Sequence, residues 1–318
     1  MWKLLADVLD YHRSLIGDRQ RCEAFRAAIH ASVRPGDVVI DIGAGSGLLS
    51  CFASQAGAAR VYAIEEGMIA DLAEVVFANN ALTDRVTLVR GKASSVMLPE
   101  KADVIVSETL WNFGLGEGIV STLYDGMTRW LKSDGRVIPE CCDLFVAAVC
   151  SRQLYRRVSD WEAPQLGVDF TGVRRMAANN VYRAVIQPSM LLSKPRKLAR
   201  VHFDRSIAAL TQEVVIELEQ PGLVHGLGGW FDAALCPGHR LSNAPPNPAP
   251  SWKQAFLPLE KPIAARAGDQ LRVKVQCLAD ESAWRWVVSR VLPRGEEPVA
   301  DHTTLGGFPT ALARLRAP

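Results

Sequence analysis

The stretch between residues 38 and 50 limits what this chain can fold into more than any other part of its sequence. The run Val38–Ile40 is apolar and rich in β-branched residues, and it leads through Asp41 and Ile42 to glycines at positions 43, 45 and 47. A helix-like pattern follows from residue 48. This order predicts a buried strand, a tight turn and the start of a helix. Glycines in such a turn let the backbone bend sharply and approach a ligand without a Cβ in the way.

A second apolar run, Ala59–Ile64, ends in Glu65. A carboxylate at the tip of the strand after a glycine-rich turn is placed to accept both ribose hydroxyls of a nucleoside. The glycines lack the spacing typical of dinucleotide sites, and Asp41 before them would repel a phosphate. An acid at this position favours a ligand with a cationic amino group, so the stretch predicts S-adenosylmethionine as cofactor and S-adenosylhomocysteine as its product. A nicotinamide cofactor, or a turn with no ligand, stays as an alternative.

The composition narrows the class of protein. A chain of 318 residues that is 48% hydrophobic is long enough for two domains with a sizeable core. The formal net charge of +2 indicates neither a nucleic acid nor an anionic membrane surface as partner. The seven cysteines lack metal-ligand spacing, which predicts reduced thiols, no metal and a cytoplasmic location. The first residues resemble an amphipathic helix rather than a signal peptide.

The pattern of apolar residues changes at Pro139. Residues 1–32 predict two helices, and residues 37–139 alternate strands with helices, as in a Rossmann-like, largely parallel sheet that binds ligands at its carboxyl edge. After Pro139, short alternating strands between Pro- and Gly-rich turns, one of them at 244–250, predict an all-β barrel or sandwich. We therefore expect an α/β protein with a cofactor-binding domain at 1–139 and a β-barrel substrate domain at 140–318.

An insertion at about 175–196 carries a short helical pattern followed by Met190, Leu191 and Leu192. Apolar residues on a projecting arm need a partner, so this segment predicts a helical dimerisation arm and a homodimer. The alternative is that the segment packs on its own barrel.

The fourth strand of the first half is followed by two acids. Glu108 comes at the carboxyl end of this strand, and Glu117 comes nine residues later, at the expected start of a helix. The loop between them contains glycine and can bring both carboxylates to one site. Two carboxylates that face each other repel. A planar cation with several N–H donors removes the conflict, because each carboxylate can accept a forked pair of hydrogen bonds.

With these motifs in order, the chain resembles the protein arginine methyltransferase family over nearly its whole length. The loop from Ser107 to Glu117 resembles that family's double-glutamate loop, and the segment from His12 to Arg21 resembles its N-terminal motif. The resemblance implies that Glu108 and Glu117 are the catalytic residues. It implies a set of cofactor-binding residues, with Arg21 at the cofactor's carboxylate: His12, Arg21, Asp41, Gly43, Gly45, Glu65 and Ser94. It implies a set on the substrate side: Asp18, Trp111, Asn112, Ser251 and Trp252.

The sequence departs from the family pattern at several of these positions. Ser251 replaces a histidine that pairs with the residue corresponding to Asp18, although a serine can still donate a hydrogen bond there. Ser94 replaces an acid that contacts adenine, and Asn112 stands where an aromatic residue is usual. Most of these departures affect the side of the site that would bind the acceptor. The chain is also slightly basic, whereas an enzyme for Arg/Gly-rich proteins is expected to have an acidic surface. Its Ala/Arg-rich composition is typical of a high-GC bacterium.

These departures favour a bacterial enzyme of specialised metabolism that methylates free L-arginine, or a small guanidino compound, to the ω-N-monomethyl product. Three alternatives stay open. One is a protein arginine methyltransferase for Arg/Gly-rich proteins, one an inactive scaffold, and one an enzyme that methylates another nucleophile.

Overall fold

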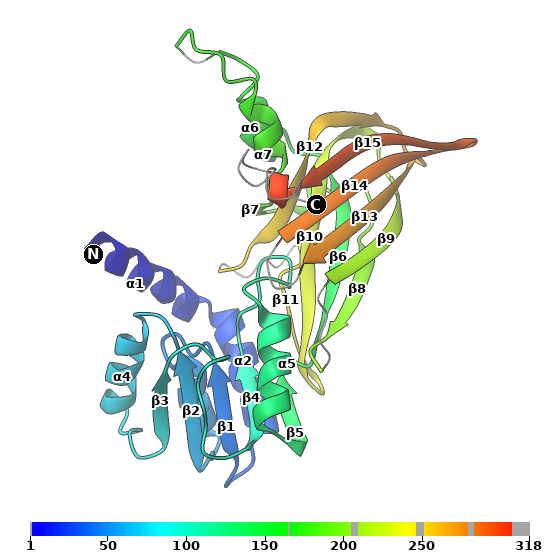
Figure 1. The fold of residues 1–318 in the computed structure, drawn as a ribbon. Helices are drawn as coiled ribbons and strands as arrows, with labels where there is room; N and C mark the ends of the chain where they lie inside the picture. The colour runs from blue at the N-terminus through cyan, green and yellow to red at the C-terminus, as the bar shows by residue number, and fades with distance from the viewer. Residues whose placement is uncertain (1, 165, 205–208, 246–250, 279–282, 307–318) are drawn as a thin grey trace, which may run out of the picture.

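The computed structural model describes residues 2–164, 166–204, 209–245, 251–278 and 283–306 (Figure 1). The chain begins with two helices, α1 (Trp2–Gly17) and α2 (Arg19–Ser32). Asp18 separates them and caps α2, because its carboxylate accepts a hydrogen bond from the Arg21 backbone N–H at 3.1 Å. The predicted helical pair is confirmed.

A five-stranded parallel sheet follows, in the order β3-β2-β1-β4-β5. Its strands and the three helices that alternate with them are β1 (Val38–Ile42), α3 (Leu48–Gln55), β2 (Arg60–Glu65), α4 (Ala70–Asn79), β3 (Val86–Arg90), β4 (Ala102–Ser107), α5 (Ile119–Trp130) and β5 (Leu131–Ile138). All of β1 is buried, as its apolar sequence predicts. The chain order reverses between β1 and β4, and ligands of such sheets bind at the carboxyl ends of the strands beside this point.

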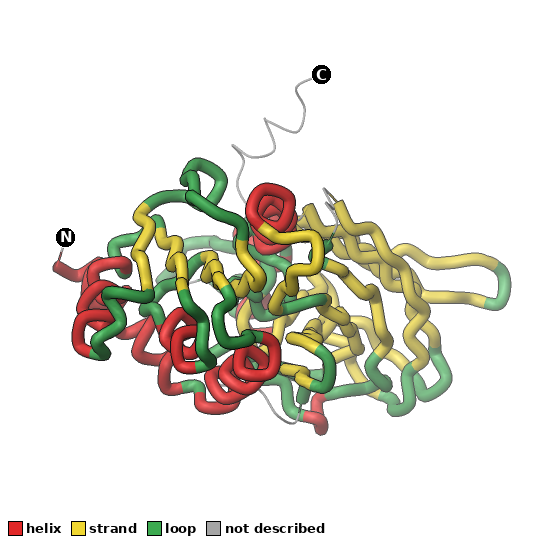
Figure 2. The backbone as a smooth tube through the Cα atoms, turned by 90° about the horizontal axis from the view of Figure 1, so that it is seen from below, coloured by secondary structure: helices red, strands yellow, loops and turns green. Residues whose placement is uncertain are grey.

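The second half consists of two antiparallel sheets. One has the order β7-β12-β10-β6-β8 with β11 paired to β10, and the other has the order β15-β14-β13-β9. Their strands are β6 (Cys141–Val149), β7 (Tyr182–Ala184), β8 (Arg196–His202), β9 (Ala209–Glu217), β10 (Gly222–Cys236), β11 (His239–Ser242), β12 (Gln254–Ala265), β13 (Gln270–Leu278), β14 (Ala283–Leu292) and β15 (Gly295–Thr303). Figure 2 shows helices gathered around the parallel sheet, whereas strands dominate the other half. The α/β class with a Rossmann-like part and an all-β part is confirmed, and the boundary at 139/140 stays a prediction.

The segment at 175–196 differs from its prediction. It holds α7 (Val173–Ala178), β7 and a 3₁₀ turn at Pro188–Met190. β7 pairs with β12, and the Leu192 N–H donates to the Ala148 carbonyl at 2.9 Å. Leu192 is 5% exposed, so the expectation of exposed apolar residues at 190–192 is wrong. The reason is that this run extends the edge of its own sheet and is covered there.

The part that projects is instead the connection between α6 (Arg152–Ser159) and α7 (Figure 1). Val168 in this connection is 53% exposed, and Leu166 and Phe170 are exposed as well. Residues 246–250 of the predicted turn and 307–318 of the predicted barrel domain lie outside the described residues. Within the described ranges, no helix is long and apolar enough to cross a membrane.

Candidate active site

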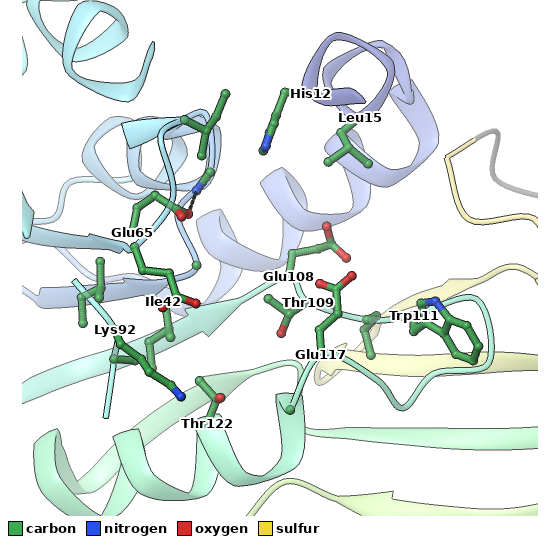
Figure 3. Close-up of a pocket in the computed structure, with 18 of the residues that line it drawn as sticks. His12, Leu15, Ile42, Glu65, Lys92, Glu108, Thr109, Trp111, Glu117 and Thr122 are labelled. Carbon is green, nitrogen blue, oxygen red and sulfur yellow. Dashed lines mark hydrogen bonds between the residues drawn. The ribbon is translucent and has the colours of Figure 1, made fainter. Parts of the chain in front are cut away.

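A cavity of 820 Å³ opens at the carboxyl edge of the parallel sheet (Figure 3). Its walls come from α1, the glycine turn after β1, the end of β2, the loop after β3, the loop between β4 and α5, and the antiparallel half. All but three of the predicted site residues line it: His12, Gly43, Gly45, Glu65, Ser94, Glu108, Trp111, Asn112, Glu117, Ser251 and Trp252. The other three are Asp18, Arg21 and Asp41. The structure therefore brings most of the predicted set to one place.

The glycine turn has the backbone that its sequence predicts. Gly43 and Gly45 have φ angles of +72° and +55°, in the left-handed region that favours glycine. A Cβ on Gly45 would lie 3.0 Å from His12 Cε1, so a side chain there would fill the space between the turn and α1. His12 is half-buried, and this burial lowers its pKa. The turn thus lets a ligand approach the backbone beside the His12 ring.

Glu65 is fixed at the end of β2 by backbone donors. Its Oε2 accepts from the Gly45 N–H at 2.8 Å, and its Oε1 accepts from the Gly67 N–H at 2.7 Å. Each carboxylate oxygen keeps a second lone pair. Ser94, in the loop after β3, is exposed on the same cavity. These groups form one polar edge of the cavity.

Asp41 lies behind the glycine turn rather than in the lining of the cavity. It is fully buried, and its Oδ2 accepts from the Ser50 hydroxyl at 2.7 Å. Its Oδ1 has no hydrogen-bond partner among the described residues. Burial raises the pKa of Asp41 to about 7, although the Ser50 hydrogen bond opposes the rise.

Glu108 and Glu117 turn their carboxylates toward each other in the middle of the cavity (Figure 3). The Glu108 side chain is 7% exposed. Burial raises the pKa of Glu108 to about 6, and the negative charge of Glu117 adds to the rise. Burial also raises the pKa of Glu117, whose φ of +51° is unusual for a residue with a side chain.

The charges that line the cavity are mostly negative. Two cationic side chains, Lys92 and Arg183, line the cavity. Five carboxylates line it as well, namely Glu65, Glu66, Glu108, Glu117 and Asp125. Such a lining attracts a cationic ligand and repels an anionic one.

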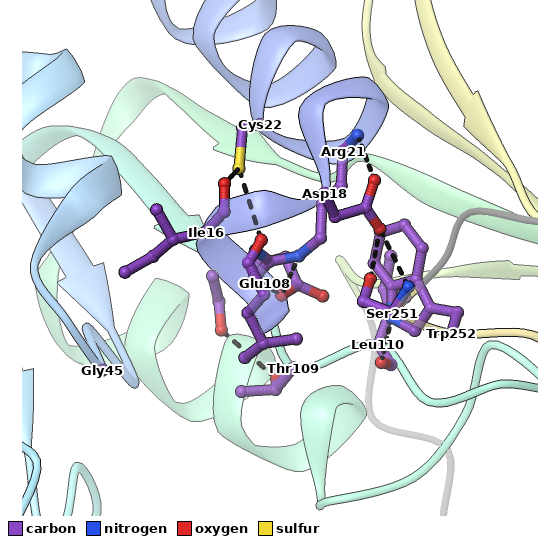
Figure 4. Close-up of polar contacts among 12 residues, drawn as sticks. Ile16, Asp18, Arg21, Cys22, Gly45, Glu108, Thr109, Leu110, Ser251 and Trp252 are labelled. Carbon is purple, nitrogen blue, oxygen red and sulfur yellow. Dashed lines mark hydrogen bonds and ion pairs between the residues drawn. The ribbon is translucent and has the colours of Figure 1, made fainter. Parts of the chain in front are cut away.

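Arg21 contacts Glu108, not the interior of the cavity (Figure 4). Its Nε donates to Glu108 Oε2 at 2.7 Å, its Nη2 donates to the same oxygen, and its Nη1 donates to the Leu15 carbonyl at 3.2 Å. Glu108 Oε1 is buried and has no hydrogen-bond partner among the described residues. Arg21 therefore holds one oxygen of Glu108, and the other oxygen has no donor among the described residues.

The hydrogen bond from Ser251 to Asp18 that the sequence allows is present (Figure 4). The Ser251 backbone N–H donates to Asp18 Oδ2 at 3.2 Å, and the Ser251 hydroxyl donates to the same oxygen. Asp18 is fully buried. It joins the start of α2 to the antiparallel half, next to the cavity.

The remaining substrate-side residues attach the loop between β4 and α5 to the antiparallel half. Trp252 Nε1 donates to the Leu110 carbonyl at 2.9 Å, and Asn112 Nδ2 donates to the Gln254 carbonyl at 3.3 Å. Trp111 stacks on Trp284 with 6.3 Å between ring centroids. All three predicted residues thus fix the position of the loop as well as line the cavity.

Sequence reasoning missed several residues that hold this loop. Phe113 stacks on Trp284 at 4.6 Å, and a Cβ on Gly229 of β10 would lie 2.7 Å from the Phe113 ring. Asn243 Nδ2 donates to the Asn112 carbonyl at 2.9 Å. The glycines at positions 114 and 116 are the one sign in the sequence that this loop packs closely. No local pattern in the sequence indicates that residue 112 contacts residue 243. Arg183 on β7, which also lines the cavity, was missed as well.

No group of three or more His, Cys, Asp or Glu side chains in the described part of the chain is arranged to hold a metal ion. The absence of a metal cofactor stays a prediction.

Comparisons with known proteins cover both halves of the chain. Residues 140–287 match the family described as "Arginine methyltransferase oligomerization subdomain", and residues 24–139 match "Ribosomal protein L11 methyltransferase (PrmA)". Protein arginine N-methyltransferase 6 of Xenopus tropicalis is 30% identical over 273 residues, which cover 79% of this chain and 78% of that protein. Histone-arginine methyltransferase CARMER of Anopheles gambiae is 31% identical over 299 residues, 86% of this chain and 46% of that protein. The chain spans about half the length of the CARMER relatives it matches.

Two solved structures share the fold. The Trypanosoma brucei PRMT1 enzyme–prozyme heterotetrameric complex with AdoHcy matches with a TM-score of 0.82 at 23% identity, over 92% of this chain and 97% of that chain. Arabidopsis thaliana protein arginine methyltransferase 10 matches with a TM-score of 0.82 at 22% identity, over 93% of this chain and 99% of that chain. The extent of the match to the Xenopus tropicalis protein shows that the chain belongs to the protein arginine methyltransferase family, within the class I S-adenosylmethionine-dependent methyltransferases.

Proposed function

We propose that this chain transfers a methyl group from S-adenosylmethionine to a guanidino nitrogen of an arginine residue in a protein. One observation carries the proposal: Glu108 and Glu117 face each other in a cavity whose other edge is the glycine turn and Glu65. A cationic cofactor and a cationic acceptor would both meet a negative lining there.

The residues of the cavity fit this cofactor. The second lone pairs of the Glu65 carboxylate can accept the two ribose hydroxyls. Gly43 and Gly45 let the ligand lie against the backbone, and a Cβ at position 45 would take up that space. His12 covers the turn from α1, and Ser94 adds a hydroxyl to the cavity wall that could bond to a polar edge of the adenine. When bound, the cofactor supplies an electrophilic methyl group on a positively charged sulfur.

Glu108 and Glu117 would hold and orient the guanidinium. The Oε1 of Glu108 is a buried acceptor without a donor, and a guanidinium offers five N–H donors in a plane. With one carboxylate on each side, the lone pair of one nitrogen can be directed at the methyl carbon. Such positioning contributes about 7–11 kcal/mol to lowering a barrier.

The same carboxylates can take up the proton that the reaction releases. Arginine has a pKa of about 12.5–13.8, so its guanidinium keeps its proton until the new bond forms. The nitrogen that takes up the methyl group must lose one proton, and Glu108 or Glu117 would accept that proton. Burial raises the pKa of Glu108 to about 6, so this carboxylate is a stronger base than an ordinary glutamate.

The comparisons favour a protein acceptor over free arginine. The relatives named above are histone-arginine and protein arginine methyltransferases, and they are eukaryotic. The predicted preference for free L-arginine in a bacterial pathway has no support among them. That preference was motivated in part by the histidine that Ser251 replaces. Ser251 keeps the hydrogen bond to Asp18 that the histidine would make, so this departure is weaker support for a changed acceptor.

We also propose that the chain forms a homodimer in the cytoplasm. The match of residues 140–287 to an oligomerization subdomain and the exposed apolar residues between α6 and α7 support the dimer. The cytoplasmic location rests on the seven free cysteines.

Transfer of a labelled methyl group tests the activity and the acceptor together. The enzyme is incubated with methyl-labelled S-adenosylmethionine and one of three acceptors: an arginine-containing peptide, the same peptide with lysine for arginine, or free L-arginine. We expect label on the arginine peptide alone. Label on free arginine alone would contradict the acceptor, and no transfer by enzyme that binds the cofactor would contradict the activity.

A further inference from the structure

A second groove, of 690 Å³, shares a lining residue with the active-site cavity. Arg183 lines both, so the two lie next to each other at this residue. The walls of the groove come from α6, from β7 with the residues after it, and from Lys253. An acceptor whose arginine reaches Glu117 would extend past Arg183 into this groove.

The groove is basic. Four cationic side chains line it, namely Arg156, Arg157, Arg183 and Lys253. Asp160 is the one acid among the described lining residues, and it pairs with Arg156 at 3.2 Å. No acidic side chain in the described ranges forms an ion pair with Arg157 or Lys253. Excess positive charge therefore remains for a ligand.

Two of these cations are held in place by the fold. Arg157 lies over the Tyr182 ring, 5.4 Å from its centroid, and its Nη2 is 3.4 Å from the Arg183 carbonyl. Arg183, which belongs to β7, donates a hydrogen bond to the Ser251 carbonyl. Its charge acts on Glu117, whose pKa it lowers against the effect of burial. Arg183 is thus close to the acceptor carboxylate as well as to the groove.

Lys253 has an unusual backbone for its position. Its φ is +56°, in the left-handed region that lysine rarely adopts. Asn243 Nδ2 donates to the Lys253 carbonyl at 2.6 Å and so supports this conformation, while the side chain is exposed in the groove. Backbone strain of this kind concentrates at sites that bind ligands.

We propose that this basic groove binds Asp or Glu residues that flank the target arginine in an acceptor protein. The inference rests on the proposed function and specifies its substrate. The inner cavity is negative and the groove next to it is positive, so the complementary acceptor is an arginine with acidic neighbours. A uniformly basic Arg/Gly-rich segment would be repelled by the groove, which discriminates against it.

Matched peptides test the charge of the acceptor. One peptide carries a single arginine with Asp and Glu on both sides, and its twin has Asn and Gln at the same positions. For the wild-type enzyme we expect kcat/KM to be about tenfold higher for the acidic peptide at low salt, and we expect the ratio to fall as salt screens the charges. Equal kcat/KM for the two peptides would overturn the proposal.

Variants locate the effect in the groove. The double variant Arg157→Gln/Lys253→Asn removes two charges, and asparagine tolerates a positive φ. It should bring the ratio of the two kcat/KM values close to one. The control Arg85→Gln/Arg294→Gln removes the same charge from two exposed turns outside the groove and should keep the wild-type ratio. A ratio that falls equally in both variants would refute a specific groove.

Fluorescence anisotropy with the labelled peptides separates this inference from the proposed function. If no arginine peptide is methylated, the proposed function fails. Binding then still tests the groove: tighter binding of the acidic peptide to wild type than to the groove variant would support it, and equal binding would refute it. If both peptides are methylated and bound equally well, the groove proposal alone fails. Methylation of free L-arginine in preference to both peptides would also refute it.

Discussion

Glu117 shows how a single side chain is positioned at a cost. Its φ of +51° places it in a region that costs about 1–3 kcal/mol for residues other than glycine. The following residue, Gly118, also has a positive φ and is the N-cap of α5. The consequence is a carboxylate that faces Glu108 instead of extending along the helix.

Replacing this carboxylate should separate catalysis from folding. Glu117→Gln keeps the shape and the backbone but removes the charge that holds the guanidinium, so we expect kcat to fall by about 100-fold or more. The melting temperature should change little. Turnover and thermal unfolding of the purified variant check both expectations.

Glu23→Gln is the matched control, because it removes one carboxylate from an exposed position outside the cavity. Glu117→Gly adds a second check, since it relieves the strained backbone and should give an inactive protein that is at least as stable as wild type. An active Glu117→Gln enzyme would contradict the assigned role.

Asp41 should make stability depend on pH. Its folded-state pKa of about 7 lies above the ordinary value of 3.8, so the folded protein binds this proton more tightly than the unfolded chain. The stability it contributes is present at low pH and is lost as pH rises through about 7. Asp41→Asn abolishes the buried charge, so its melting temperature relative to wild type should rise between pH 5 and pH 8.

Asp143→Asn serves as the comparison for this pH series. Its ion pairs with Arg200 and Lys197 lower the pKa of Asp143 to about 2, so the carboxylate is charged at both pH values. Its variant should be destabilised to the same extent at pH 5 and pH 8. A difference between Asp41→Asn and wild type that does not vary with pH would show that Asp41 does not titrate in this range.

At the scale of helices and strands, the hydrogen bonds between Asp18 and Ser251 join the start of α2 to the antiparallel half. One buried carboxylate both caps α2 and accepts from the segment before β12. This contact lies beside Arg21 and hence beside Glu108. Displacing α2 would therefore disturb the catalytic carboxylate as well.

A double-mutant cycle measures this link. Asp18→Asn and Ser251→Ala each weaken the contact, so their effects on the free energy of unfolding should not add, with a coupling energy of about 1–2 kcal/mol. Ser121→Ala, which removes a hydrogen bond within one turn of α5, should add to Asp18→Asn without coupling. Additive effects of Asp18→Asn and Ser251→Ala would show that the contact carries no energy.

Local patterns predicted the elements that hold the cofactor, but not every contact of the site. The glycine turn, Glu65 and the paired glutamates follow from strand periodicity and from spacings along a short stretch of sequence. The partner of Arg21 lies 87 positions away, and the edge that covers Leu192 is set by pairing with a distant strand. Such contacts depend on tertiary packing, which spacing along the chain does not encode. The eight-residue helix α6, which lines the basic groove, is shorter than the window of about 11–18 residues over which helical periodicity is read.

Across the assembled protein, the exposed connection between α6 and α7 should mediate dimer formation. Leu166 and Val168 are exposed apolar residues there. Leu166→Asp/Val168→Asp should convert a dimer into a monomer, because charges on an apolar contact are costly to bury. Sedimentation velocity gives the mass of both proteins.

Met97→Asp is the control for this pair, since Met97 is apolar and 84% exposed but lies beside the parallel sheet. It should leave the dimer intact. A wild-type monomer, or a dimer that survives both substitutions in the connection, would contradict this surface as the interface.

The central claim is that two carboxylates hold one guanidinium beside the cofactor. The measurement that tests it most directly is a crystal structure of the protein with S-adenosylhomocysteine and an arginine peptide. We expect the guanidinium between Glu108 and Glu117, with Glu108 Oε1 accepting one of its N–H groups and Glu65 bound to the ribose. A peptide arginine bound elsewhere, or carboxylates turned away from it while the cofactor product is in place, would contradict the account.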